Sequence, residues 1–304
     1  MPVYLPIAEL SLDLFFLLGI GAAVGFVSGL FGVGGGFLLT PLLLFSGVPS
    51  PVAVGSVTAQ VIASSTSGAL AHFRRGSVDI KLGAFLVLGG VFGSALGVWL
   101  FGVLEGLGQL ELFLSLGYLV LLGSIGMAML IESVRAAIKR GRHQPVARRM
   151  PGRSTWVQGM PWRTRFRKSQ LYISVVPVVM IGFAIGIIGA LLGIGGGFVL
   201  VPALVYILRV PGKVVVGTSL LHLVAVMAVT CFLHAISSQS VDTLLAFCLM
   251  LGSVAGAQFG VAAGANLPGE QLRTLLALLI LAIAIRFGVG VVLWPADPFT
   301  LAKV

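Results

Sequence analysis

A glycine-rich motif that occurs twice is the part of this sequence best suited to bind an anion. The segment LFGVGGGFLLTP at positions 30–41 returns as LLGIGGGFVLVP at positions 191–202, with its glycines and its proline at the same spacing. Glycine and proline disfavour helix interiors, so each copy predicts a break followed by a short helix. The backbone N–H groups of Gly34, Gly35 and Gly36, and of Gly195, Gly196 and Gly197, could bind oxyanion oxygens beside a helix N-terminus. The alternative is that these glycines only allow close helix packing.

Polar side chains inside two apolar segments form a second set of candidates. Gln60 and His222 occupy matching positions of the repeat, each about eight residues, or about 12 Å, into its segment. By the i, i+4 spacing, Ser64 shares a helix face with Gln60, and Thr218 shares one with His222. These groups can donate hydrogen bonds to an anion, and His222 could couple binding to protons. The hydroxyls could instead bond within their own helix, and His222 could have an ordinary interior partner.

Arg286 is a third candidate, because it falls within the apolar segment 272–294. An arginine at membrane depth is costly and therefore a functional hypothesis by default. The acidic residues of the chain fall in predicted loops or at segment ends, so a bound anion could be its counter-charge. The alternative is that Arg286 extends toward the membrane surface or bonds helix-end carbonyls.

The composition indicates the elements that hold these residues. Hydrophobic residues make up 58% of the 304 positions and charged residues 9%, with a mean hydropathy of +1.11. Such a chain is predicted to be an all-α polytopic membrane protein. Apolar runs predict ten segments, of which eight are long enough to cross as regular helices, at roughly 20 residues each. The second and seventh are short and follow the glycine motifs; the ten are 10–31, 35–47, 52–73, 82–104, 110–131, 171–192, 196–208, 214–236, 243–264 and 272–294.

The repeat continues beyond the glycine motif and defines the predicted organisation. Gly55-Ser56 matches Gly217-Thr218, His72 matches His234, and Val78-Asp79 matches Val241-Asp242. We therefore expect a first half at 1–134, a basic linker at 135–169 and a second half at 170–304. Each aspartate of the repeat is expected to cap the helix that follows it.

The distribution of basic residues predicts the orientation. Eleven of the nineteen Lys and Arg residues fall between Arg135 and Lys168, where no acidic residue occurs. A cytoplasmic linker and ten crossing segments place 17 of the 19 inside, which satisfies the positive-inside rule. Five segments per half then require the halves to insert with opposite topology, the inverted-repeat plan of secondary transporters. If the second and seventh segments were re-entrant, Arg209 and Lys213 would instead lie outside. The linker could attract anionic lipid, and nucleic acid is not the expected partner.

These residues resemble a known family. The doubled G-x-G-G-G-F-x-L-x-P pattern, followed in each half by the Gly-Ser or Gly-Thr pair, a histidine and Val-Asp, is similar to the sulfite exporter TauE/SafE family. The resemblance implies a bacterial inner-membrane permease for anions such as sulfite and organosulfonates. The long basic insertion at 135–169 departs from the family pattern.

A secondary carrier for small anions is the predicted function, and an anion channel with the same glycine-lined site is the alternative. A cation site would usually need a carboxylate within the bilayer, and the sequence places none there. An intramembrane hydrolase is disfavoured because no nucleophile-elbow pattern occurs. We expect no cofactor, disulfide or metal site, since both cysteines fall inside predicted helices. Coupling to protons or another ion, and assembly as a homodimer, stay open.

Overall fold

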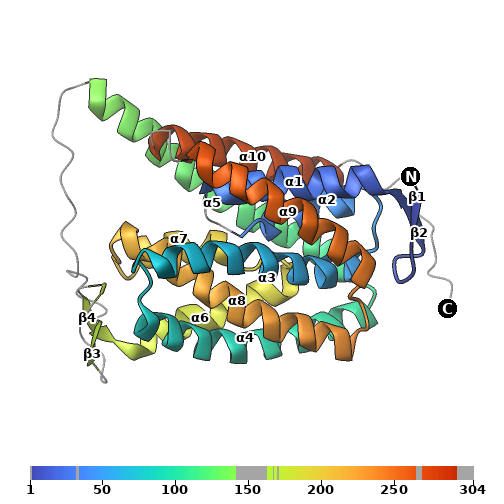
Figure 1. The fold of residues 1–304 in the computed structure, drawn as a ribbon, viewed down its shortest axis with the longest axis horizontal. Helices are drawn as coiled ribbons and strands as arrows, with labels where there is room; N and C mark the ends of the chain where they lie inside the picture. The colour runs from blue at the N-terminus through green and yellow to red at the C-terminus, as the bar shows by residue number, and fades with distance from the viewer. Residues whose placement is uncertain are drawn as a thin grey trace. The chain divides into compact units, whose positions relative to one another are not determined.

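The computed structural model describes residues 2–31, 34–141, 163–166, 168–169, 171–264 and 269–292 (Figure 1). These residues form ten helices and four short strands. The helices are α1 (Leu14–Phe31), α2 (Gly36–Phe45), α3 (Ser50–Arg74), α4 (Ile80–Gly106), α5 (Leu110–Gly141), α6 (Val175–Leu192), α7 (Gly197–Tyr206), α8 (Gly212–Ser237), α9 (Thr243–Gly264) and α10 (Gly269–Val292). The strands are β1 (Pro2–Leu5), β2 (Leu10–Asp13), β3 (Arg163–Phe166) and β4 (Leu171–Ser174).

The ten helices confirm the ten predicted segments, and α2 and α7 are short, at 10 residues each. Among the described residues, six helices are both long and apolar enough to cross a membrane: α1, α4 and α6 and most of α5, α8 and α9. The expected number was eight. The other two long helices are α3, which carries Ser, Thr and Gln side chains along its length, and α10, in which the described stretch Thr274–Gly290 is apolar.

Two β-hairpins precede α1 and α6, and the sequence did not predict them. Strand β1 pairs with β2 and β3 with β4, both antiparallel, and Pro2 opposite Asp13 corresponds to Arg163 opposite Ser174. The first helix therefore begins at Leu14 and the sixth at Val175, each four residues later than predicted. Phe166 of β3 is fully buried in an apolar cluster with α4, α6, α7 and α8. Part of the predicted linker is thus packed structure.

The chain forms two compact units, and the first comprises residues 1–105 and 147–267. Within it, α1 packs against α9 and α4 against α6, with glycines at both contacts. A Cβ atom on Gly256 would collide with the Ala22 carbonyl, and one on Gly93 with the Phe183 carbonyl. These contacts occupy matching positions of the repeat. Helices α3 and α8 lie side by side in the same unit (Figure 1).

The second unit comprises residues 106–146 and 268–304, in which α5 packs against α10. The rings of Tyr118 and Phe287 stack with their centroids 5.0 Å apart. Each unit therefore takes helices from both sequence halves. The halves at 1–134 and 170–304 describe the repeat, and this division stays a prediction.

Candidate functional site

Both glycine motifs form tight turns that lead directly into a short helix. Gly34 and Gly35 have φ angles of 91° and 74°, and Gly195 and Gly196 have φ angles of 75° and 74°. These left-handed conformations favour glycine because a Cβ atom would clash with the backbone. Gly35 caps α2 and Gly196 caps α7, so the positive ends of two helix dipoles begin at these turns. The N–H of Gly36 donates to the Gly34 carbonyl at 3.0 Å, so that donor is already engaged.

The two turns lie against the same pair of side chains. A Cβ atom on Gly34 would lie 3.0 Å from Leu223 Cδ1 and 3.7 Å from Val61 Cγ1. One on Gly195 would lie 2.8 Å from Val61 Cγ1 and 3.3 Å from Leu223 Cδ2. Val61 belongs to α3 and Leu223 to α8, at matching positions of the repeat. The two glycine turns therefore converge on the α3–α8 pair.

Direct contacts also join the two turns and the short helices that follow them. A Cβ atom on Gly36 would lie 2.8 Å from the carbonyl oxygens of both Gly193 and Ile194. Thr40 Oγ1 donates to the Gly193 carbonyl at 3.4 Å. The rings of Phe37 and Phe198 stack at 5.3 Å. Close packing is therefore one role of these glycines, and anion binding stays a prediction.

Gln60 and His222 are fully buried, and they have no hydrogen-bond partner among the described residues. This holds for both amide atoms of Gln60 and for both ring nitrogens of His222. They directly precede Val61 and Leu223, the side chains that touch both glycine turns. An unsatisfied buried polar group costs about 1–3 kcal/mol, so two at equivalent positions require an explanation.

The predicted hydroxyl groups differ in what they contact. Ser64 Oγ donates to the Gly34 carbonyl at 3.3 Å and to the Val61 carbonyl at 3.2 Å, which ties α3 to the first glycine turn. Ser65 Oγ, which the sequence places in the same polar patch as Ser64, is buried without a partner in the described chain and faces Gly34. Thr218 Oγ1 accepts a hydrogen bond from the Asp79 N–H at 3.1 Å. Its role as a substrate ligand stays a prediction.

Arg286 lies on α10 in the second unit, and its side chain is exposed. It has an interaction within the protein. Its proposed contact with the substrate stays a prediction.

The two repeat aspartates cap helices as predicted, and they also make contacts that the sequence did not reveal. Asp79 Oδ1 accepts from the Leu82 N–H at 3.2 Å at the start of α4. Asp79 Oδ2 accepts from the N–H and hydroxyl of Ser169, between β3 and β4, at 3.0 and 2.7 Å. The carboxylate, which is 3% exposed, therefore joins a helix of the first half to the hairpin of the second.

Asp242 makes the equivalent contacts and joins a helix of the second half to the hairpin of the first half. Its Oδ1 accepts from the N–H of Leu245 at 3.1 Å at the start of α9, and its Oδ2 from the N–H of Ile7, between β1 and β2, at 3.0 Å. The Asp242 N–H donates to Ser56 Oγ at 2.9 Å, as the Asp79 N–H donates to Thr218. The matched Gly-Ser, Gly-Thr and Val-Asp pairs of the repeat are the residues that make these two N–H to hydroxyl contacts.

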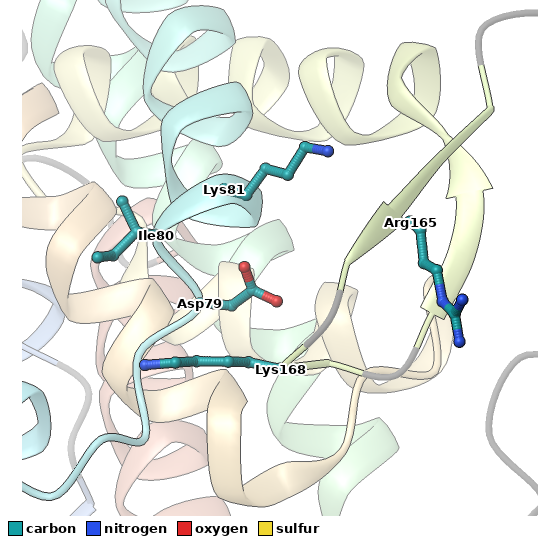
Figure 2. Close-up of a pocket in the computed structure, with 5 residues that line it drawn as sticks. All are labelled: Asp79, Ile80, Lys81, Arg165 and Lys168. Carbon is teal, nitrogen blue, oxygen red and sulfur yellow. The ribbon is translucent and has the colours of Figure 1, made fainter.

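A basic pocket of about 280 Å³ lies beside Asp79, and the described residues that line it are not among those predicted to bind substrate. Figure 2 shows Asp79 between the first turn of α4 and the β3–β4 hairpin, with Lys81, Arg165 and Lys168 around it. Lys81 Nζ lies 5.9 Å from the centroid of the Phe166 ring. Three cationic side chains thus surround one carboxylate that is already hydrogen-bonded.

Comparison with known proteins identifies the family. The model of the sulfite exporter TauE/SafE family matches residues 17–287, which include both glycine turns, Gln60, His222 and Arg286. The chain belongs to this family.

Several curated relatives are similar over most of the chain. The Bacillus subtilis "Probable membrane transporter protein YjnA" is 26% identical over 88% of this chain and 96% of its own length. A "Probable membrane transporter protein" of Xylella fastidiosa is 29% identical over 90% of this chain and 94% of its own length. No solved structure matches the chain. Because the family model and these relatives match most of the chain, this TauE/SafE member is an integral membrane transporter.

Proposed function

We propose that this TauE/SafE protein is a secondary carrier for small anions, most consistent with sulfite or organosulfonate-type compounds. One observation carries the proposal. Gln60 and His222 are buried and unpartnered in the described chain, and each directly precedes a side chain, Val61 or Leu223, that contacts both glycine turns. Such side chains can donate hydrogen bonds to the oxygens of a sulfur oxyanion.

The charge of the groups near this point supports an anion over a cation. A metal or alkali cation would be held by carboxylate and carbonyl oxygens. The buried carboxylates of Asp79 and Asp242 are bonded to helix and hairpin N–H groups at helix starts. The N-termini of α2 and α7 supply partial positive charge at the glycine turns. Discontinuous helices of this kind bind anionic substrate groups in other secondary transporters.

Burial favours a carrier over the alternative, an anion channel with the same glycine-lined site. Gln60, His222 and the six glycines at positions 34–36 and 195–197 are all buried in this structure. A substrate could reach them only after the surrounding helices move. Such movement is the basis of alternating access, whereas an open channel exposes its lining to water.

The membrane arrangement that we propose is an inverted repeat of five segments per half in the bacterial inner membrane. The matched contacts of α1 with α9 and of α6 with α4 support two equivalent halves. The excess of Lys and Arg at positions 135–168 supports a cytoplasmic central segment. Anionic lipid is a candidate partner of that segment.

A flux assay with the purified protein in proteoliposomes tests the proposed function. Sulfite, sulfate, thiosulfate and methanesulfonate are offered in turn under imposed pH and voltage gradients. We expect saturable accumulation of at least one of them, and its loss in Gln60→Ala and His222→Ala. Thr66→Ala is the matched control, because its exposed hydroxyl bonds its own helix at the Ile62 carbonyl. Discrete single-channel currents would support the channel, and absence of flux for every anion would refute both.

A further inference from the structure

His222 lies among helices whose described charged side chains stand toward the helix ends. Its Nε2 faces Gly90 of α4, where an added Cβ atom would lie 2.6 Å away. Helix α6 carries no ionisable side chain. On α3, α4, α7 and α8, the described charged or titratable groups other than His222 stand toward the helix ends: His72, Arg74, Lys81, Glu105, Tyr206, Cys231 and His234.

At a buried histidine such as His222, the binding of an anion and the binding of a proton should favour each other. A lone anion inside a low-dielectric protein is costly, and so is a lone imidazolium. An anion beside a protonated imidazole forms a compensated pair that costs less than either charge alone. Binding of the anion therefore favours binding of the proton, and by linkage the proton favours the anion to the same extent.

We propose that His222 takes up one proton with each anion, so that the transporter moves an anion and a proton in the same direction. This inference rests on the proposed carrier function. An imidazole nitrogen of His222 accepts the proton from water on the side where the anion enters, and returns it to water on the other side. No covalent bond forms with the substrate.

The repeat limits the number of protons that can bind together with one anion. The equivalent of His222 in the first half is Gln60, whose amide can donate hydrogen bonds to the anion but does not titrate. Ser65, the other unpartnered buried group near the first turn, does not titrate near neutral pH either. We therefore expect one proton per anion. Transport of a monovalent sulfonate would then carry no net charge across the membrane.

The decisive measurement uses anions whose own charge does not change over the range tested. Methanesulfonate and thiosulfate stay fully ionised between about pH 5 and 8, where histidine titrates. The wild-type protein is placed in proteoliposomes that contain a trapped pH-sensitive dye. We expect methanesulfonate uptake to acidify the lumen. We also expect uptake to accelerate as the external pH falls, by at most about tenfold per pH unit.

Three results distinguish the two proposals. Accumulation of either anion with acidification supports both. Accumulation without acidification overturns the proton coupling and leaves the carrier function standing. No accumulation of methanesulfonate, thiosulfate, sulfite or sulfate overturns the carrier function and the coupling together.

Replacing His222 with the residue found at the equivalent position of the other half tests whether His222 carries the proton. His222→Gln introduces the side chain found at the equivalent position 60, keeps a hydrogen-bond donor and removes the titrating group. We expect this variant to lose luminal acidification and to show less than about a twofold change of uptake with pH. His72→Gln is the matched control, because His72 is half-buried at the end of α3 and contacts Ser77 Oγ at 3.0 Å. Persistent acidification in folded His222→Gln protein would refute the assignment. Loss of uptake in folded His222→Gln protein would also refute the assignment, because the retained donor should still bind the anion.

Discussion

At the scale of single residues, the candidate site is defined by polar groups whose hydrogen-bonding capacity the protein does not use. Gln60 and His222 share complete burial with many core side chains, but their amide and imidazole atoms have no partner in the described chain. Buried Thr230 shows the ordinary alternative, since its hydroxyl donates to the Val226 carbonyl at 2.8 Å. A residue kept for binding can thus lower stability and still be needed.

Gln60→Met should therefore separate stability from function. Methionine has nearly the volume of glutamine and removes an unsatisfied amide, so we expect unfolding in detergent to become harder by about 1–3 kcal/mol. Transport should be lost. The midpoint of denaturant unfolding and the initial uptake rate check the two effects. Thr230→Val, which removes a satisfied hydroxyl, should not stabilise the protein. Destabilisation of Gln60→Met would indicate a structural role for Gln60 instead.

Gly196→Ala should impair both folding and transport. Its φ of 74° costs an alanine about 1–2 kcal/mol, and the new methyl group would collide with Ile185. Gly47→Ala is a control for backbone strain alone, because Gly47 has a φ of 82° and no neighbour within 4 Å of the added atom. Thermal unfolding and uptake are measured for both variants. A loss of stability no greater than that of Gly47→Ala would show that the turn tolerates the methyl group.

At the scale of elements, each β-hairpin is held to a helix of the other half by one buried aspartate. Asp79 bonds Ser169 beside the second hairpin, and Asp242 bonds the Ile7 N–H beside the first. The same residues begin α4 and α9 through helix-capping bonds. In each half, therefore, one aspartate carboxylate caps the start of one helix and also holds the hairpin that leads into another helix.

Asp242→Asn and Asp79→Asn should destabilise the protein to similar degrees. Asparagine keeps one oxygen for the helix cap but presents an NH₂ group to a backbone N–H. We expect a loss of about 1–3 kcal/mol in each variant from the unsatisfied donor. Chemical denaturation in detergent, with limited proteolysis of the hairpins, is the measurement. Asp13→Asn is the control, since this exposed aspartate caps Phe15 at 3.0 Å. An effect no larger than that of the control would contradict the clamp.

The sequence predicted the helices better than the hairpins for a physical reason. Long apolar runs and the glycine breaks are local signals, so all ten helices and the shortness of α2 and α7 were found. The strands are four residues long, and the residues at 163–174 look like the end of a basic loop. Phe166 reveals its role only through its burial among four helices. The bonds of Asp79 and Asp242 to the hairpins are likewise tertiary, and no local pattern encodes them.

The predicted site shows the same division between local and tertiary information. The position of Gln60 and His222 in the repeat singled them out, and the structure shows both buried without a partner in the described chain, next in sequence to the residues that contact the glycine turns. The hydroxyl of Thr218 was predicted on the same helix face as His222, yet it accepts from the Asp79 N–H. Spacing along a helix identifies a face of that helix, whereas the partner on that face depends on the neighbouring element.

At the scale of the whole molecule, the proposed function depends on how many times the chain crosses the membrane. The two halves insert with opposite topology only if each contributes an odd number of crossings. The number depends on α2 and α7, because 10 residues of helix span about 15 Å, half of the hydrocarbon thickness. The glycine turns before them could complete the crossing through the protein interior.

Single cysteines introduced into a variant without Cys231 and Cys248 test these crossings. With the basic segment in the cytoplasm, full crossing of α7 places Arg209 inside, and full crossing of α2 places Tyr4 outside. Both side chains are exposed in the structure. A membrane-impermeant maleimide added to intact cells should therefore label Tyr4→Cys and spare Arg209→Cys until the cells are opened.

Two further positions keep the same side under either arrangement and serve as controls. Counting back from a cytoplasmic basic segment, exposed Leu107 lies outside and exposed Gly76 lies inside, whether or not α2 and α7 cross. Labelling of Arg209→Cys together with Leu107→Cys in intact cells would make α7 re-entrant, and protection of Tyr4→Cys with Gly76→Cys would do the same for α2. Either result leaves an even number of crossings in that half. Opposed insertion would then fail, and with it the arrangement in which two equivalent half-sites approach one anion from opposite sides of the membrane.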